Sequence, residues 1–282
     1  MNKLLRADFR RLWKSKIFYL GIATLFIFAL ISTVARIYEG KILREPNYMT
    51  PDGLLFNGIM LLSVVISIFV SMYIWTDGAD GIWRNKVVVG CTKTKMFFSY
   101  WIVTGITTTL FHLVYIFVVL SLSSVTLDGF QTPAEVNVVL IFCSLLTVLA
   151  INSFVVLICS FSPNKALCVI FCVLFMMGLW SVGLTARSHL AQPKFFAEYT
   201  YTDSEGVVNE IPKIENSNYI SGAKRKIVQF IADFLPTGQS YSMNQRFTSM
   251  SFDFLIWAVY SATFCLITAS LSFTIFKHRD LK

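Results

Sequence analysis

The chain has 282 residues, of which 55% are hydrophobic and only 14% carry a charge. Soluble domains contain about 25% charged residues, so this composition excludes an ordinary soluble protein. The formal net charge of +8 does not indicate nucleic acid, because the cations lie beside long apolar runs, where anionic lipid headgroups supply the counter-charge. We predict an all-α polytopic membrane protein with six spans and one transmembrane domain over residues 1–282.

Residues 1–16 predict a basic amphipathic helix that lies in the membrane interface. The first span follows directly at residues 17–35, which is long enough at about 1.5 Å per residue to cross a bilayer. Thr33-Val34-Ala35 imitates a signal-peptidase site. Because the apolar run exceeds the ~7–15 residues of a signal core, we predict an uncleaved helix. The apolar arc of the interfacial helix contains Leu4, Leu5, Phe9, Leu12 and Trp13, and the opposite arc contains Lys3, Arg6, Arg10, Arg11 and Lys14.

Five further apolar runs predict spans at residues 54–75, 101–122, 136–160, 166–184 and 252–276. Cations gather on one side of the membrane in this topology, since six Lys or Arg lie within 1–16 and four within the 76–100 connection. The 123–135 loop on the other side has none. The positive-inside rule therefore places both termini in the cytoplasm and residues 185–251 on the outer side of the membrane.

The 76–100 connection is the longest basic segment on the predicted cytoplasmic side. Gly81 and Gly90 bracket a short helical stretch, as breakers do at helix ends. Such a helix suits docking onto a soluble partner, and the alternative is an ordinary positive-inside loop. The candidate coupling residues are Asp80, Gly81, Ile82, Trp83, Arg84, Asn85 and Lys86, with Arg10 and Arg11 of the interfacial helix.

The span interiors carry no Asp, Glu, Lys or Arg. Ion-coupled carriers and voltage sensors depend on such groups at membrane depth, so this pattern disfavours both classes. The polar candidates for a transport path are Asn57, His112 and Asn152. Each is more typical of an interhelical hydrogen bond than of a substrate ligand, and a proton relay at His112 lacks a carboxylate partner.

Catalytic motifs are absent from the sequence. Gly90-Cys91-Thr92-Lys93-Thr94 does not satisfy the phosphate-loop pattern GxxxxGK[ST], and neither HExxH nor GxSxG occurs. We therefore predict no catalytic residue, no metal and no cofactor in this chain. None of the six cysteines falls in a predicted outside loop, so no disulfide framework is expected. Cys168 and Cys172 share a helix face, but no His or carboxylate nearby completes a metal set, and we interpret them as packing residues.

Within the outer segment, residues 219–235 show the apolar periodicity of a helix that ends at a Pro/Gly break. This helix either lies on the outer leaflet as a surface element or dips into the bundle as a lid over an exit. Residues 186–218 are polar and predict no regular structure. The candidate gate residues are Ile227, Phe230, Ile231, Phe234 and Pro236.

Several stretches, in this order, resemble one family. They are the basic start at residues 4–16, the loop Asp80-Gly81-Ile82-Trp83-Arg84-Asn85-Lys86 with its apolar continuation to Gly90, the stretches 218–222 and 234–239, and the closing residues 279–282. Together they resemble the six-span permease subunits of type-2 ATP-binding-cassette exporters, especially those near bacteriocin-immunity and antibiotic-resistance exporters of Gram-positive bacteria. The resemblance covers essentially the whole chain. Trp83 departs from the small or β-branched residue usual before the arginine.

The resemblance implies an assembly of two permeases, identical or different, with two ATPase subunits that bind the ATP and Mg. The interfacial helix and the 80–90 helix are then the elements that sit in a groove of the ATPase. Spans one, two and five line the path between the permeases, and the outer helices gate the exit. The expected function is a permease subunit of an ATP-driven exporter that moves an amphipathic or hydrophobic compound, such as a peptide antibiotic, a lipid-like molecule or a drug.

Two other classes stay open at this point. The chain could be a non-transporting membrane scaffold or an immunity protein that binds a toxin at the outer surface through residues 185–251. An ion-coupled carrier would need a functional role for His112. An adjacent ATPase gene would favour export over the scaffold.

Overall fold

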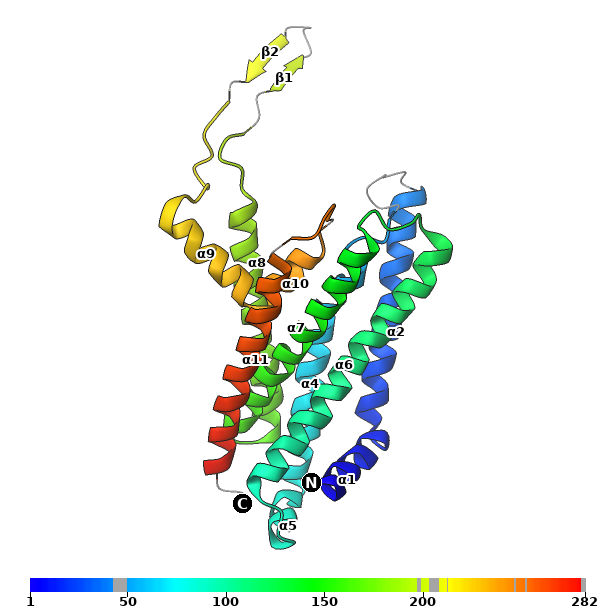
Figure 1. Cartoon of the computed structure of the whole chain (residues 1–282), viewed down its shortest axis with the longest axis vertical. Helices are drawn as coiled ribbons and strands as arrows, with labels where there is room; N and C mark the ends of the chain where they lie inside the picture. Colours follow the sequence, from blue (N-terminus) through cyan, green and yellow to red (C-terminus); the bar gives the residue numbers. More distant parts are fainter. Residues whose placement is uncertain are drawn as a thin grey trace.

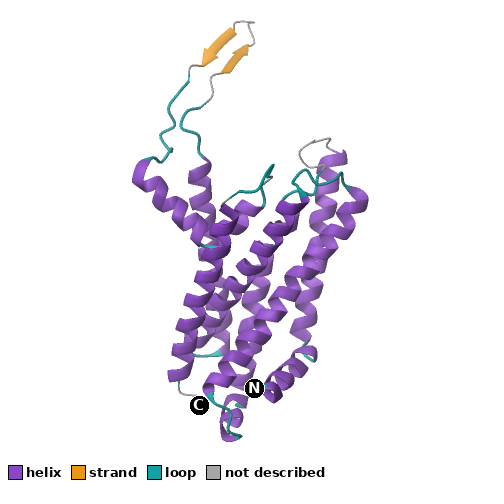
Figure 2. Cartoon of the chain, in the orientation of Figure 1, coloured by secondary structure: helices purple, strands orange, loops and turns teal. Residues whose placement is uncertain are grey.

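The computed structural model describes residues 1–42, 50–196, 199–202, 208–211, 213–245, 247–251 and 253–279 (Figure 1). Long helices run side by side over most of its length, and a two-stranded hairpin projects from one end (Figure 2). Helix α1 (Asn2–Trp13) and the last turn of α11 (Asp253–His278) lie at the opposite end, which we call the termini end. Residues 280–282 of the predicted tail and Phe252 of the predicted sixth span lie outside the described residues.

Within the described residues, six helices are long and apolar enough to cross a membrane. The six predicted helical spans are thus confirmed, and the chain is a multi-pass membrane protein. The spans comprise α2 (Lys16–Ile37) with the π-helical turn η1 (Tyr38–Ile42), α3 (Leu54–Asn57) with α4 (Ile59–Ala79), α6 (Lys93–Thr126), α7 (Ala134–Phe161), α8 (Lys165–Ala191) and α11.

Three helices extend well past the predicted spans. Helix α4 ends at Ala79, α6 already begins at Lys93, and α8 continues to Ala191. The predicted limits marked where hydropathy falls, whereas a helix continues through polar residues until a cap or breaker ends it. Thr92 provides such a cap, because its hydroxyl accepts a backbone N–H of the first turn of α6 at 3.3 Å. The connection predicted over 76–100 therefore shrinks to residues 80–92.

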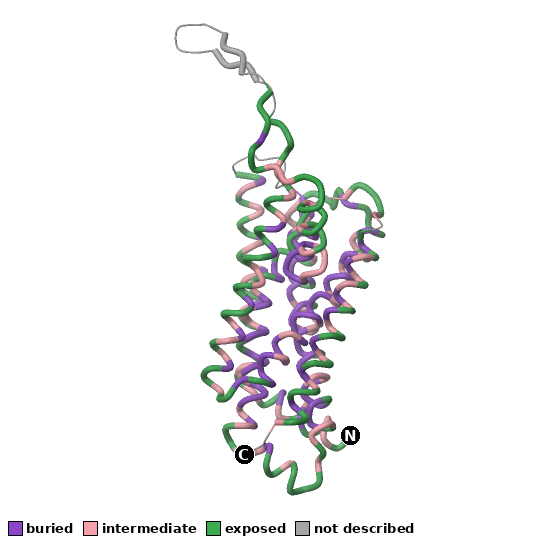
Figure 3. The backbone as a smooth tube through the Cα atoms, turned by 90° about the vertical axis from the view of Figure 1, so that its left-hand side faces the viewer, coloured by how far each residue is buried: buried purple, intermediate pink, exposed green. Residues whose placement is uncertain are grey.

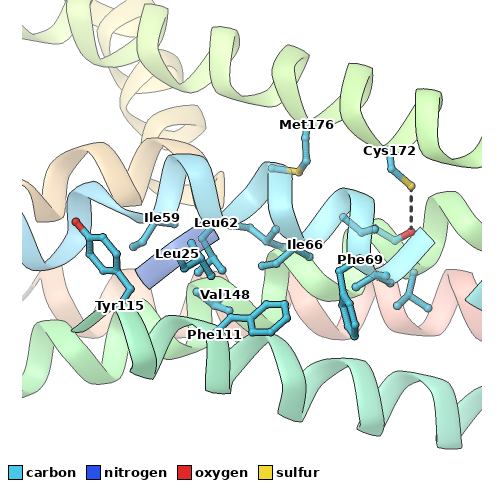
Figure 4. Close-up of a cluster of buried hydrophobic side chains, with 14 of the residues drawn as sticks. Leu25, Ile59, Leu62, Ile66, Phe69, Phe111, Tyr115, Val148, Cys172 and Met176 are labelled. Carbon is cyan, nitrogen blue, oxygen red and sulfur yellow. Dashed lines mark hydrogen bonds between the residues drawn. The ribbon is translucent and has the colours of Figure 1, made fainter. Parts of the chain in front are cut away.

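Helix α4 lies at the centre of the bundle. In the most apolar 18-residue stretch of its span 67% of the residues are buried, against 28% in α2 and 22% in α8. Leu62, Ile66 and Phe69 of α4 pack between Phe111 of α6 and Met176 of α8 (Figure 4). Buried residues follow the inside of the bundle and exposed residues its outside (Figure 3). The outer faces of α2 and α8 remain apolar and uncovered, as expected for surfaces that meet lipid or another membrane helix.

The chain turns back into the bundle after the hairpin. Helix α9 (Gly222–Phe234) lies against α8 and α11, and α10 (Pro236–Met243) is almost wholly buried. The Pro/Gly stretch ends α9 at Phe234, as predicted. Pro236 also begins α10, where its missing N–H costs nothing. Gly238 permits this packing, because a Cβ there would overlap the backbone carbonyl of Ala232. The two alternatives concerned the helix over 219–235, which is α9, and its only buried residue is Ala232. The element that enters the bundle is the unpredicted α10.

The segment predicted to be irregular contains a β-hairpin. Strands β1 (Tyr199–Thr202) and β2 (Val208–Ile211) pair antiparallel, with Tyr199 opposite Ile211 and Thr202 opposite Val208. The alternating Tyr and Thr residues of β1 favour a strand, a local signal that the overall polarity of the segment obscured. The all-α class therefore needs this one qualification.

Replacing Gly238 with alanine tests the close approach of α9 and α10. We expect Gly238→Ala to lower the free energy of unfolding by about 1–3 kcal/mol, because the added methyl group meets backbone atoms that have little room to move. Thermal unfolding of the purified protein in detergent measures this loss. Gly178→Ala in α8 is the control, since nothing lies within 4 Å of a Cβ at that position. Equal losses in both variants would contradict the steric explanation.

Asp52 ties two connections together at the hairpin end. Its carboxylate accepts the backbone N–H groups of Gln131 at 3.0 Å and Thr132 at 2.9 Å, and Arg36 donates to its backbone carbonyl at 3.1 Å. Burial acts to raise the pKa of Asp52, but the hydrogen bonds from Thr132 and Gln131 outweigh it and hold the pKa below the ordinary value of 3.8. The ionised carboxylate therefore stabilises the fold.

This stabilisation has a defined pH dependence. Since the pKa of Asp52 is lower in the folded chain, its contribution is present above pH 3.8 and is lost as the pH falls through the folded pKa. We expect the unfolding temperature of the wild-type protein to fall between about pH 5 and about pH 3 by more than that of Asp52→Asn, whose amide does not titrate. Thermal unfolding at a series of pH values measures both. Parallel curves for the two proteins would show that Asp52 is not the group responsible.

Candidate functional site

A short helix, α5 (Ile82–Val88), extends from the termini end between α4 and α6 (Figure 1). Gly81 caps its start with a φ of +68°, and Gly90 follows its end with a φ of +88°. Both values lie in the left-handed region that favours glycine. Nothing lies within 4 Å of a Cβ at either position, so the backbone conformation alone calls for these glycines. The predicted short helix between two glycine breakers is confirmed.

Trp83 anchors the inner side of α5. Its ring is 3% exposed and lies 5.2 Å from the ring of Trp75 in α4 and 5.9 Å from that of Phe276 in α11. The guanidinium of Arg279 lies over both tryptophans, 4.5 Å from the Trp75 ring and 5.4 Å from the Trp83 ring. Trp83 therefore fastens α5 to the bundle, and its ring lies on the side of α5 opposite the exposed residues.

Four ionisable side chains meet beside α5, and we call Asp8, Arg11, Asp77 and Lys86 the ionic cluster. The Lys86 ammonium lies 2.9 Å from Asp8 Oδ1 and 2.9 Å from Asp77 Oδ2. Arg11 forms an ion pair with the other oxygen of Asp77. The cluster thereby links α1, α4 and α5, three elements that are separate in the sequence.

Hydroxyl groups complete the coordination of the two carboxylates. Ser99 donates to Asp8 Oδ2 at 2.5 Å, and Tyr100 donates to Asp77 Oδ2 at 2.5 Å, both from the first turns of α6. The Tyr73 hydroxyl donates to the backbone carbonyl of Asp8 at 2.9 Å. Helix α6 thus becomes the fourth element held by the same network.

The ionic cluster has no net formal charge and is mostly buried, with the Arg11 side chain 28% exposed. Asp77 is fully buried, and the Lys86 side chain is 15% exposed. Burial lowers the pKa of Lys86, and the charge of Asp8 acts in the opposite direction. Removing one member of such a cluster leaves a buried charge without its partner, which is costly even where the intact pair contributes little net stability. The attachment of α1 and α5 is therefore specific to this arrangement.

The outer side of α5 is exposed and carries both aliphatic and basic side chains. Val87 is 43%, Val88 81% and Val89 83% exposed, and Arg84 and Asn85 are exposed beside them. We call these five residues the α5 tip. Valine is usually buried, so three consecutive exposed valines beyond the ends of the spans are unusual. Exposed apolar patches of this kind are found at protein interfaces.

The predicted coupling residues separate into two groups. Asp80, Arg84, Asn85 and Arg10 are exposed at the termini end. Arg11, Trp83 and Lys86 instead point inward and hold the helices in place, as described above, and Gly81 and Ile82 are half-buried between them. The valines of the α5 tip were not among the predicted contacts, although their position in a polar connection was visible in the sequence.

The three polar candidates for a transport path lie apart from one another. Asn57 is exposed near the hairpin end, on the wall of an open cleft of about 310 Å³. His112 is buried, and its Nε2 lies 2.9 Å from Ser144 Oγ of α7, the interhelical hydrogen bond that the sequence favoured. Asn152 is buried in α7 opposite Gly105. The structure does not combine them into one site.

The candidate gate residues surround the re-entrant segment. Ile227 and Phe230 are exposed on α9, Ile231 is half-buried, and Pro236 is buried at the start of α10. Phe234 stacks on Phe230 with ring centroids 5.4 Å apart. Outside these candidates, Arg187 of α8 pairs with Asp233 at 2.6 Å, and Trp257 of α11 donates to the same carboxylate at 3.0 Å. Asp233 therefore fixes α9 between the two helices that flank it.

Sequence reasoning missed Asp8, although a signal was present. It is the only acidic residue among the first 38. At 100° per residue it falls on the same face as Leu5 and Leu12, and that face is the one that packs against the bundle. An acidic residue on an apolar face predicts a buried partner of opposite charge.

Comparison of the chain with protein-family models, with curated proteins and with solved structures finds no match. The resemblance to exporter permeases therefore stays a prediction from the residues.

A double-mutant cycle measures the ionic cluster. We expect Lys86→Met to lower the free energy of unfolding by about 3–5 kcal/mol, because Asp8 and Asp77 lose a buried counter-charge. Adding Asp8→Asn to Lys86→Met removes one of the orphaned charges, so the double variant should lose less than the sum of the single losses. Thermal unfolding in detergent gives the values.

Lys95→Met is the matched control, because Lys95 is an exposed cation of the same end, and its loss should stay within about 0.5 kcal/mol. Strictly additive effects of Asp8→Asn and Lys86→Met would contradict the coupling.

Proposed function

We propose that this chain is the membrane-spanning permease subunit of an ATP-driven exporter, coupled to a separate ATPase dimer and paired with a second permease. The observation that carries the proposal is α5, a short helix with an exposed aliphatic and basic tip that is firmly attached to the spans. The proposed orientation places this end in the cytoplasm, where the ATPase resides.

The attachment of α5 suits the transmission of force. A helix that receives a push from a partner passes it on only if its own base does not yield. Trp83 fastens α5 to α4 and α11, and Lys86 fastens it to α1 and α4. Movement of the α5 tip would therefore move α1, α4 and α11 as near-rigid bodies, the type of rearrangement that alternates access in transporters.

The uncovered helices suit a second permease. In the most apolar stretches of α2 and α8 only 28% and 22% of the residues are buried, with 28% in α11, whereas 67% are buried in the span that contains α4. In the proposed assembly α2 and α8 face the partner copy and line the path between the two permeases. The second span, expected from the resemblance to share this position, lies behind them in the centre of the chain.

The hairpin end suits an exit for amphipathic or hydrophobic compounds. A cleft of about 340 Å³ lies between α8 and α9, with Val182, Ala186, Val228 and Ile231 on its walls. Exposed Ile227 and Phe230 extend the apolar surface of α9 beyond it. A compound that leaves the path here would meet apolar side chains first, and α9 with α10 would act as the gate. Peptide antibiotics, lipid-like molecules and drugs share the chemistry that this surface favours.

Placing negative charges at the α5 tip tests its proposed role in docking the ATPase. We expect the double variant Arg84→Glu/Val88→Glu to lose the co-purifying ATPase, because both side chains are exposed on the surface proposed to bind it. Its membrane insertion and unfolding temperature should be unchanged, since neither residue belongs to the ionic cluster. Affinity purification of the tagged chain from its native membrane, with identification of the co-eluting chains, measures the loss. Lys86→Glu is unsuitable for this purpose because it breaks the cluster itself.

Lys224→Glu is the control, because it reverses an exposed cation on α9 at the hairpin end. A tip variant that retains the ATPase would refute docking through α5. Purification of the wild-type chain with no ATPase, but with a toxin bound through residues 185–251, would favour the immunity or scaffold function instead.

A further inference from the structure

Three cysteine side chains converge at the termini end, and we call them the thiol triad. Cys159 comes from the last turn of α7, and Cys168 and Cys172 come from the first two turns of α8, across the turn at residues 162–164. The Sγ–Sγ distances are 3.4 Å for Cys159–Cys168, 4.0 Å for Cys159–Cys172 and 4.0 Å for Cys168–Cys172. All three residues are at most 2% exposed. The sequence pattern showed the pair on α8 but not the third thiol.

These three distances match the size of a metal site. In a triangle with these sides the centre lies about 2.2 Å from each sulfur, close to the ~2.3 Å of a metal–thiolate bond. Cysteines that serve only in packing need not place their sulfur atoms so that one point lies at metal-bonding distance from all three. The three ligand atoms are thus already arranged around one common centre.

The ligand set identifies the class of ion. Within the part of the chain that the structure describes, no His, Asp or Glu joins the three cysteines. Zinc in structural sites is almost always four-coordinate, whereas soft thiolate and thioether ligands select Cu(I). Met176 continues the stripe one turn beyond Cys172 and is also buried, and Figure 4 shows these two side chains on α8. With Cys168, α8 therefore carries three buried sulfur atoms at successive turns. A buried set of three sulfurs favours a monovalent soft ion over a hard divalent one.

The surroundings supply a positive charge. Arg279 donates to the backbone carbonyls of Cys159 at 3.3 Å, Ser160 at 3.0 Å and Ser162 at 2.6 Å, at the turn that joins α7 to α8. Its guanidinium therefore lies at the turn that follows Cys159. Thiols that bind a metal release their protons to solvent, and this guanidinium offsets part of the negative charge that remains. No electron transfer and no oxidant are required.

We propose that the thiol triad binds one Cu(I) ion through three sulfur atoms and so fastens α7 to α8 at the termini end. The proposal is independent of the exporter function, because it rests on the sulfur positions alone. A bound ion would reinforce the turn against which Trp75 and Arg279 pack. It would thereby stiffen the base on which Trp83 and α5 rest.

Metal titration of the full chain tests the proposal. The protein is purified in detergent under reducing, oxygen-free conditions and titrated with Cu(I) in competition with a chromophoric Cu(I) chelator. We expect one Cu(I) per chain, and X-ray absorption at the copper edge should show three sulfurs at about 2.2 Å. Cys159→Ser, Cys168→Ser and Cys172→Ser should each weaken binding by roughly 100-fold or more, since even outer-shell changes cost up to that amount.

Cys91→Ser and Cys265→Ser are the controls, because both cysteines lie outside the triad, and each should retain one Cu(I) with unchanged affinity. Gel filtration identifies any variant that fails to fold, and the copper-edge spectrum of the wild-type chain decides the question without variants. A chain that retains no copper, or triad variants that bind as the wild type does, would overturn the proposal. So would a Cys159–Cys168 disulfide that persists under reduction, or a parallel titration that finds stoichiometric four-coordinate Zn²⁺ in place of Cu(I).

Discussion

The balanced burial of two carboxylates and two cations at the termini end is the interaction on which the rest of the arrangement depends. Asp8 and Asp77 are each surrounded by hydrogen-bond donors and counter-charges from α1, α4, α5 and α6. In a low-dielectric environment each of these charged groups needs its partner, because a buried charge without one costs several kcal/mol. Four helices that touch mainly through apolar surfaces thereby acquire one relative position, which apolar contacts alone specify poorly.

Sequence periodicity and hydropathy were sufficient to locate the spanning helices but insufficient to identify the residues at which those helices begin and end. The apolar runs located every span, because a bilayer requires a helix of minimum length. The ends of α4, α6 and α8 depend on caps and breakers such as Thr92, and those act beyond the hydropathic limit. The re-entrant α10 lay beyond sequence reasoning. The Pro/Gly break predicts the end of α9, but a second buried helix from Pro236 depends on the close approach at Gly238, which is a contact between segments.

In the candidate site, too, features set by neighbouring residues could be predicted from the sequence, whereas contacts between distant residues could not. Gly81 and Gly90 predicted the two ends of α5, because the positive φ values that end a helix are a local property of the backbone and favour glycine. The role of Lys86 was invisible, since its partners lie 78 and 9 residues away, and a basic residue in a basic connection has no distinguishing pattern. The thiol triad is similar, because two of its members were visible at i and i+4 and the third joins only through the turn between α7 and α8.

The ionic cluster also constrains the order in which the chain can be assembled. Asp8 is synthesised early, but the ammonium group that neutralises it belongs to Lys86, and Ser99 follows later still. Until α5 and the start of α6 leave the ribosome, α1 has no complete binding site on the bundle. Its docking can therefore be completed only after the chain has been synthesised as far as Tyr100.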